Sequence, residues 1–189
     1  MRVPFLSEEE LEHRAAQTLD NAFVDGVDSN FPLDVEAIVE FYLNYELSYT
    51  SQLPLGIEGE TDWIQRKIRV SDVVKNDGRC RFTIAHEIGH IILHVPLFIA
   101  HERQTPIFAS AHSLHQDGRL EIQADRFAAH LLMPRNAVGT LYRSLNRPNG
   151  LITAEEVAET FGTSKQAAQI RLETLGLLSK NNPGQRLNL

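Results

Sequence analysis

Two histidines four residues apart on an apolar helix most limit how this chain can fold. Residues 86–90 read His-Glu-Ile-Gly-His, and the apolar pattern around them predicts a buried helix over about residues 80–95. Positions i and i+4 share one helix face, so His86 and His90 can reach one ion, with Glu87 beside the water that ion would carry. A histidine on an apolar helix more often simply packs, and a five-residue pattern can arise by chance. A third ligand therefore has to decide between the two interpretations.

A second amphipathic segment offers that ligand. A catalytic zinc ion takes three protein ligands and keeps a fourth position open for water. Glu121 and Asp125 are also four residues apart, on a predicted helix over residues 119–133 whose apolar side would pack against the first helix. Glu121 would complete a His, His, Glu set, and Asp125 would accept the other ring N–H of a ligand histidine, which we expect to be His86. In isolation such carboxylates more often lie on a solvated helix face, so the pair gains its meaning from the upstream motif.

Together the two segments resemble a known family. The stretches from Arg81 to His94 and from Glu121 to Pro134 look like those of the ImmA/IrrE metallo-endopeptidases. The resemblance is specific over residues 79–134 and weaker from about residue 34 to 178. It implies a zincin-like α+β domain in a cytoplasmic protein of bacterial or phage origin. It also implies a protein substrate, a helix-turn-helix repressor whose cleavage turns on stress-response or mobile-element genes.

The resemblance also assigns roles by position. It implies that His86, His90 and Glu121 hold one Zn²⁺ ion per chain and that Glu87 is the catalytic carboxylate. In the mechanism this would support, Glu87 takes a proton from the attacking water and passes it to the departing amine.

Other histidines lie near the motif or in the connection that follows it. His94 is one further turn along the helix, about 12 Å of rise beyond His86, which is too far for one ion on a regular helix. We therefore consider that His94 lines the cleft or contacts the metal ligands from behind, or else simply packs. His101, His112 and His115 fall in a long connection, roughly residues 96–118, which could shape the substrate cleft, and any one of the three could stabilise the developing oxyanion.

Three short strands are expected ahead of the motif helix. Aromatic and branched residues at 45–50, 56–59 and 63–70 are separated by polar or Pro/Gly turns. We expect a small antiparallel sheet beside the motif helix, with an edge that an extended peptide could follow. The third strand is the first candidate for the substrate cradle. With helices predicted over about 8–23 and 34–43, the fold class is α+β and mostly helical.

The C-terminal quarter introduces a competing function. Residues 153–172 have the helix, Gly-bearing turn, helix order of a helix-turn-helix unit. As a DNA reader this unit is poorly charged, because Lys165 and Arg171 of its second helix are offset by Glu173, whereas phosphate contacts need several cations. We expect it to serve structure or substrate docking, and direct DNA binding to be unlikely.

The predicted domain organisation follows from these segments. A zincin-like metallopeptidase domain would span residues 1–149, and the helix-turn-helix-like unit at 150–178 would pack on it. Residues 179–189 would form a flexible tail.

Composition and charge fit a cytosolic enzyme. Of the 189 residues, 42% are hydrophobic and 23% charged, which is ordinary globular usage. No signal peptide is apparent, and no apolar run approaches the roughly 20 residues of a membrane span. A single cysteine, Cys80, excludes an internal disulfide and favours a reducing compartment.

The charges are unevenly distributed along the chain. Residues 1–62 carry 14 acidic and 2 basic side chains, whereas residues 63–149 carry 12 basic and 7 acidic ones. The acidic front disfavours nonspecific binding to nucleic acid and could contact a basic partner such as a repressor, although a solvated acidic helix is the simpler interpretation.

Two classes of function remain open. One is a zinc endopeptidase that cuts a transcriptional regulator. The other is a non-proteolytic regulatory protein that binds metal, DNA or a partner, as an antitoxin-like protein would. The ligand set with Glu87 favours the first class, because a structural zinc normally has all four positions closed by Cys or His and needs no adjacent base.

Overall fold

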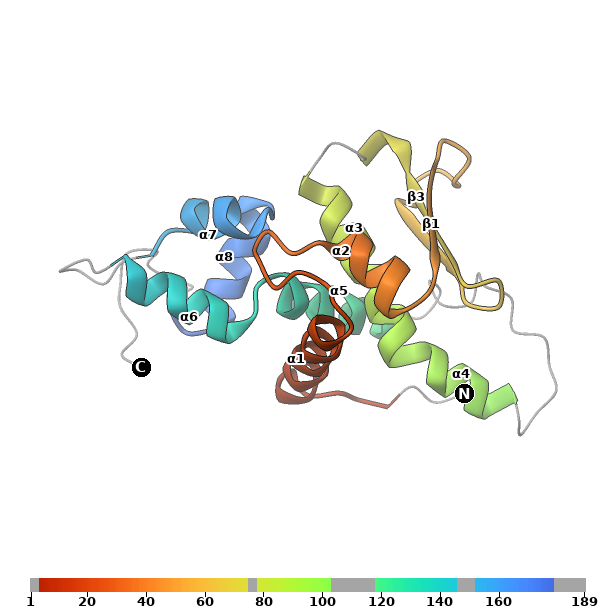
Figure 1. Ribbon diagram of the computed structural model, residues 1–189, viewed down its shortest axis with the longest axis horizontal. Helices are drawn as coiled ribbons and strands as arrows, with labels where there is room; N and C mark the ends of the chain where they lie inside the picture. The colour runs from red at the N-terminus through yellow and green to blue at the C-terminus, as the bar shows by residue number, and fades with distance from the viewer. Residues whose placement is uncertain (1–3, 75–77, 103–117, 146–151, 179–189) are drawn as a thin grey trace.

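One small sheet lies at one side of a mostly helical fold in the computed structural model, which describes residues 4–74, 78–102, 118–145 and 152–178 (Figure 1). Two irregular helical segments, η1 (Ile38–Tyr42) and η3 (His90–His94), are π-helical, and η2 (Asp72–Val74) is a 3₁₀ turn. The elements in chain order are α1 (Glu8–Val24), α2 (Val35–Ala37), η1 (Ile38–Tyr42), β1 (Glu46–Thr50), β2 (Gly59–Asp62), β3 (Lys67–Ser71), η2 (Asp72–Val74), α3 (Gly78–Gly89), η3 (His90–His94), α4 (Val95–Glu102), α5 (Gly118–Leu132), α6 (Arg135–Ser144), α7 (Ala154–Phe161) and α8 (Lys165–Thr174). The α+β, mostly helical fold class predicted from the sequence is confirmed.

The central rod of the molecule is formed by α3, η3 and α4, which follow one another without a break. The predicted helix over residues 80–95 is confirmed and is longer than expected. In the π-helical turn, the Val95 N–H donates to the His90 carbonyl, five residues back. The stretch Arg79–Ala100 is long and apolar enough to cross a membrane, but 61% of its apolar window is buried inside the fold, as in the core helix of a soluble protein.

Helix α5 crosses α3 closely at a position where each helix carries a small residue. A Cβ added to Gly89 would lie 3.2 Å from the Ala124 Cα and 3.3 Å from the Ala124 carbonyl oxygen. Any side chain at residue 89 would push the two backbones apart. The absence of a side chain at residue 89 therefore brings the two helices that carry the site into contact.

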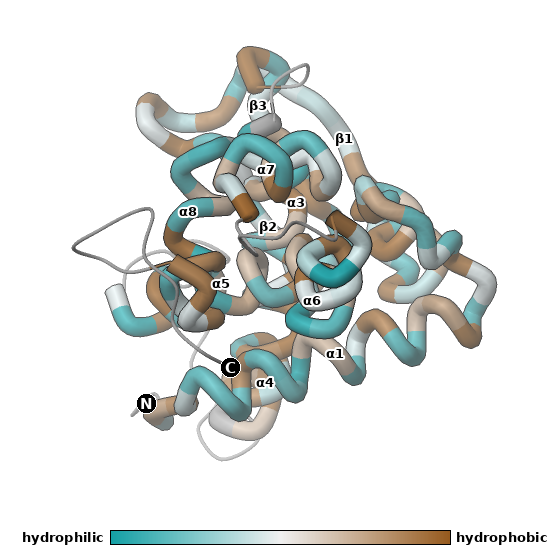
Figure 2. Tube along the Cα trace, turned by 90° about the vertical axis from the view of Figure 1, so that its left-hand side faces the viewer, coloured by the Kyte–Doolittle hydropathy of each residue, from teal (hydrophilic) through white to brown (hydrophobic). Residues whose placement is uncertain are grey.

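Helix α1 covers the other side of α5. Hydrophobic and hydrophilic residues alternate along α1 in the hydropathy view (Figure 2). Its start is fixed by a capping box, in which Ser7 and Glu10 each bond the backbone N–H of the other. Its buried face consists of Leu11, Ala15, Thr18, Leu19 and Ala22.

The sheet has the strand order β1-β3-β2, which differs from the antiparallel sheet predicted from the sequence. Strand β3 pairs antiparallel with β2 but parallel with β1. The third strand is therefore central and has no open edge, so its predicted role as substrate cradle is wrong. The edge strand nearest α3 is β2, where a Cβ on Gly59 would lie 2.7 Å from the Thr83 side chain.

The strand boundaries also differ from the predicted ones, because a turn takes the place of the start of the predicted third strand. The Asp62 carboxylate accepts the backbone N–H groups of Ile64 and Gln65, at 3.1 and 2.9 Å, and Arg66 has a positive φ of 54°. These bonds form a tight turn at residues 63–66. The aromatic and branched residues there, Trp63 and Ile64, were assigned to the third strand because side-chain preference alone cannot distinguish a turn of this kind.

The last two helices form the expected helix, turn, helix unit. Thr153 and Ser164 cap α7 and α8, and Gly162 ends α7 in the left-handed conformation, with φ 61°. Arg171 of α8 is 1% exposed and donates to the Met133 carbonyl at 2.9 Å and to Glu12 of α1 at 2.7 Å. The unit is thereby held on the rest of the fold. The predicted boundary at 149/150 and the predicted tail at 179–189 lie outside the described residues, and the domain division stays a prediction.

Candidate metal centre

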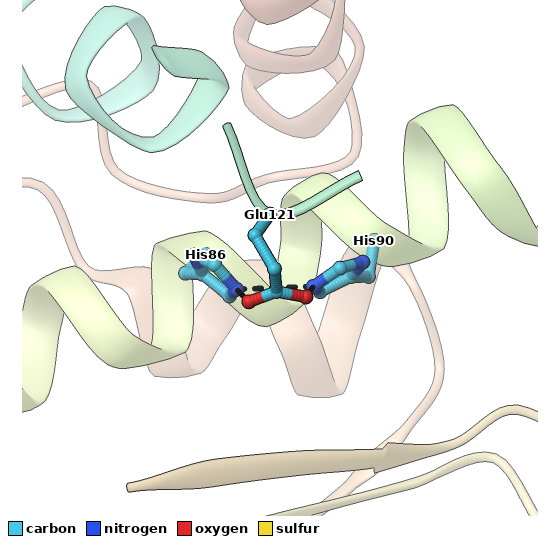
Figure 3. Close-up of side chains that lie close together, drawn as sticks. All are labelled: His86, His90 and Glu121. Atoms are coloured by element: carbon cyan, nitrogen blue, oxygen red, sulfur yellow. Dashed lines mark hydrogen bonds and ion pairs between the residues drawn. The ribbon is translucent and has the colours of Figure 1, made fainter. Parts of the chain in front are cut away.

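Three side chains from two helices converge on one point. The two carboxylate oxygens of Glu121 on α5 lie 3.3 Å from the Nε2 atoms of His86 and His90 (Figure 3). The two Nε2 atoms are 3.0 Å apart, and the potential ligand atoms all lie within 4.8 Å of one another. The set anticipated from the i, i+4 spacing is therefore brought together.

The donors fit a zinc ion in both kind and spacing. Two imidazole nitrogens and one carboxylate are a ligand set found in zinc hydrolases. Ligands at about 2.1 Å from a tetrahedral ion lie about 3.4 Å from one another, which is close to the separations observed here. The set found among the described residues has three members, so a tetrahedral ion held by them would have its fourth position for water, as a hydrolytic site requires.

His86 sits between two carboxylates. Its Nδ1 lies 2.8 Å from the Asp125 Oδ1, in the position expected for a partner that fixes the ring from behind. Burial lowers the pKa of His86, but the hydrogen bonds to Asp125 and Glu121 outweigh burial and raise that pKa to about 10. The surroundings of this ring therefore favour a positive charge, which a divalent cation can also supply.

Glu87 is almost fully buried, with 1% of its surface exposed, beneath β2. Its Oε2 accepts a hydrogen bond of 2.6 Å from the Thr61 hydroxyl. A Cβ on Gly59 would lie 2.7 Å from its Oε1, so only glycine leaves room for this carboxylate. Sequence reasoning missed Gly59 and Thr61, because the second strand was predicted to end at residue 59.

Of the alternatives considered for His94, contact with a candidate ligand from behind agrees with its position in the structure, and lining of a cleft does not. His94 is fully buried, and its Nδ1 lies 3.0 Å from the Nδ1 of His90. Its Nε2 lies 3.0 Å from the side-chain amide oxygen, Oε1, of Gln123. Burial has the largest effect on the pKa of His94, followed by charge repulsion from His90. Together they lower this pKa to about 4, so the ring is neutral. His112 and His115 lie outside the described residues.

A cavity of about 600 Å³ adjoins the centre, between α3, α5 and α8. Its lining includes Asp125, the partner of His86, and combines the apolar side chains of Phe82, Ala167 and Ile170 with charged ones such as Arg79. This cavity therefore offers both apolar and charged surface next to the residue that backs His86.

Comparison with known proteins identifies the relatives of this arrangement. The model of the IrrE N-terminal-like domain, peptidase M78, matches residues 38–173. Eleven chains of known structure match; among them, a Mycobacterium tuberculosis transcriptional regulator aligns with a TM-score of 0.60 at 14% identity, over 92% of this chain and 49% of its own length. This chain thus spans about half of that regulator, and the likeness is one of fold. No match was found among the curated proteins compared. Because the family model covers most of the chain, including every residue of the centre, the protein belongs to the IrrE N-terminal-like family of metallopeptidases.

Proposed function

We propose that the protein is a zinc-dependent endopeptidase that cleaves a helix-turn-helix transcriptional repressor in the cytoplasm and so derepresses stress-response or mobile-element genes. The observation that supports this most directly is the meeting of His86, His90 and Glu121 at one point, with the buried carboxylate of Glu87 next to the first ligand. Membership of a peptidase family supports a protein substrate.

The residues of the chain divide the chemistry among them. Zinc, when bound, lowers the pKa of a water molecule towards about 7 and polarises the peptide carbonyl. Glu87 would accept the water proton at a carboxylate oxygen and deliver it to the departing amine. Thr61, which donates to Oε2, keeps the Glu87 carboxylate in one orientation through this exchange. Asp125 orients His86 from behind.

The substrate would lie across two neighbouring features. The edge of β2 can pair with an extended peptide, and the cavity beside Asp125 can take an apolar side chain. The acidic side chains in residues 1–62 suit a basic partner, and DNA-binding repressors are usually basic.

DNA binding by the C-terminal unit is the less favoured function. The guanidinium of Arg171 is buried and bonded to Glu12, so it is withdrawn from any DNA surface. The ammonium of Lys165 pairs with Glu155 of α7. The second helix of the unit therefore presents little positive charge to a phosphate backbone.

Incubating the purified protein with the helix-turn-helix repressors of its own genome tests the proposal. We expect zinc-dependent cleavage that a chelator stops and that the variant Glu87→Gln does not show. An intact repressor in the presence of zinc would contradict the proposal. Tight, sequence-dependent gel shifts with genomic fragments at moderate salt would support the DNA-binding alternative instead.

A further inference from the structure

A chain of hydrogen bonds runs from a metal ligand to the segment in front of α1. The Nδ1 atoms of His90 and His94 are 3.0 Å apart, and the Nε2 of His94 is 3.0 Å from the Oε1 of Gln123. The Nε2 of Gln123 is 2.9 Å from the carbonyl oxygen of Pro4. His90 and His94 are fully buried and Gln123 is 6% exposed, so bulk water does not substitute for the contacts among these three side chains, whereas Pro4 is exposed.

The direction of every hydrogen bond in this chain follows from its last member. The carbonyl oxygen of Pro4 can only accept, so the amide group of Gln123 must donate to it through Nε2. The Oε1 of Gln123 then faces His94 and accepts the N–H at Nε2 of that ring. A neutral imidazole with its proton on Nε2 has a lone pair at Nδ1, which accepts from the Nδ1–H of His90.

The reverse arrangement leaves two acceptors facing each other. If His90 carried its proton on Nε2, His94 would have to donate from Nδ1 and accept at Nε2. The Gln123 amide would then turn its NH₂ group to His94 and its oxygen to the oxygen of Pro4. Two carbonyl oxygens at this distance repel, and an unmade hydrogen bond at the buried side chain of Gln123 is costly.

We propose that Gln123 and His94 are positioning residues that hold His90 as the Nδ1–H tautomer and so direct the lone pair of its Nε2 towards the metal. The inference rests on the proposed metal centre at His86, His90 and Glu121. The two ligand rings then differ in kind, since His86 is backed by the carboxylate of Asp125 and His90 by a neutral ring whose orientation is set from the N-terminal segment. Losing such a partner typically weakens metal binding by about 10- to 100-fold.

Nitrogen NMR of the metal-free full chain tests the tautomer directly. Long-range ¹H–¹⁵N spectra of ¹⁵N-histidine protein distinguish a protonated ring nitrogen from one with a lone pair. We expect the His90 Nδ1 and the His94 Nε2 to carry protons in the wild type. A His90 ring with its proton on Nε2 alone would overturn the proposal.

Variants test whether the chain of hydrogen bonds from Pro4 through Gln123 and His94 to His90, here called the relay, affects metal binding. His94→Leu removes the acceptor for the Nδ1–H of His90, whereas His94→Gln keeps a carbonyl acceptor for His90 and an NH₂ donor for Gln123. Zinc affinity, measured by competition with a chelator, should fall about 10- to 100-fold in His94→Leu and recover in His94→Gln. Gln123→Leu should weaken zinc binding and add the second tautomer of His90 to the spectrum. Equal zinc affinity in His94→Leu and the wild type would overturn the proposal.

Two further readouts separate folding and metal binding from the relay. Gln123→Glu keeps an acceptor for His94 but places a carboxylate against the Pro4 oxygen, so it should disturb the N-terminal segment in a folded protein whose His90 tautomer is retained. If the tautomer is as proposed but zinc does not bind, the metal centre fails and the relay stands. If zinc binds tightly but substitutions at residue 123 do not change the His90 tautomer, the relay is excluded and the metal centre is supported.

Discussion

At the scale of single residues, Glu87 should separate metal binding from hydrolysis. Its carboxylate lies outside the set of potential ligand atoms, so Glu87→Gln should retain zinc. The amide cannot take a proton from water, and cleavage should fall by about 10²- to 10⁴-fold. Glu121→Ala should lose both zinc and cleavage. Metal content by atomic emission and repressor cleavage by gel assay check both variants. Wild-type cleavage by Glu87→Gln would show that the base is another group.

Thr61 should affect turnover without affecting zinc. Thr61→Val keeps the shape of the side chain but removes the hydrogen bond to the Glu87 Oε2. The loss of a bond to a charged group, about 1.5 kcal/mol, corresponds to roughly tenfold in kcat. Thr61→Ser restores the hydroxyl and is the matched control. If Thr61→Val and Thr61→Ser have the same kcat, the hydroxyl does not orient Glu87.

At the scale of helices and strands, the crossing of α3 and α5 depends on Gly89. Replacing a helical glycine by alanine ordinarily stabilises a helix by up to about 1 kcal/mol. At residue 89 a Cβ meets the backbone of Ala124, so Gly89→Val should lower the free energy of unfolding by about 1 to 3 kcal/mol and move Glu121 away from the histidines. Urea unfolding and zinc affinity measure the two effects.

Gly139 in α6 provides the comparison for that experiment. A Cβ there would meet only the flexible end of Arg143, at 3.4 Å. Gly139→Ala should therefore gain stability and leave zinc affinity unchanged. A Gly89→Val variant that is as stable as the wild type and binds zinc equally well would mean that the crossing can widen without cost.

The helical part of the centre could be predicted from the sequence, whereas the strand contribution could not. His86, His90, Glu121 and Asp125 follow from i, i+4 spacing, which is local and survives any detail of the fold. Thr61 reaches Glu87 only through the register of β2 and the placement of the sheet, which depend on contacts distant in the chain.

Two other features had no readable signal in one sequence. The parallel pairing of β1 with β3 depends on the path of residues 51–58, which connect β1 to β2 on the far side of β3. Strand propensity does not indicate whether a strand pairs parallel or antiparallel. Gln123 lies between two expected site residues, but an isolated glutamine on a helix carries no indication of its partner.

At the scale of the whole molecule, Glu12 of α1 joins three elements through two arginines. Burial raises the pKa of Glu12, but the hydrogen bonds to Arg135 and Arg171 outweigh burial and lower it below its usual value. A depressed carboxyl pKa contributes stability above the unfolded value of about 4.5, and that contribution is lost as the pH falls through the folded pKa. The protein should therefore lose stability on acidification below about pH 4.5.

Glu12→Gln tests this contribution. The variant leaves the buried guanidinium of Arg171 without its counter-charge, so it should be less stable by about 3 kcal/mol near neutral pH and lose less on acidification. Glu9→Gln, at an exposed position of the same helix, is the control. Parallel pH profiles of urea unfolding for wild type and Glu12→Gln would exclude Glu12 as the source of the acid sensitivity.

The burial of Arg171 also determines how the protein comes apart. If α8 separated from the rest of the fold, the guanidinium of Arg171 would lose its hydrogen bonds to Met133, at the end of α5, and to Glu12 of α1. The last two helices should therefore melt together with the metal-binding body, as one calorimetric transition. A protease acting on the native protein should not release them as a separate folded fragment. We also do not expect α7 and α8 to move as a unit relative to the rest of the protein.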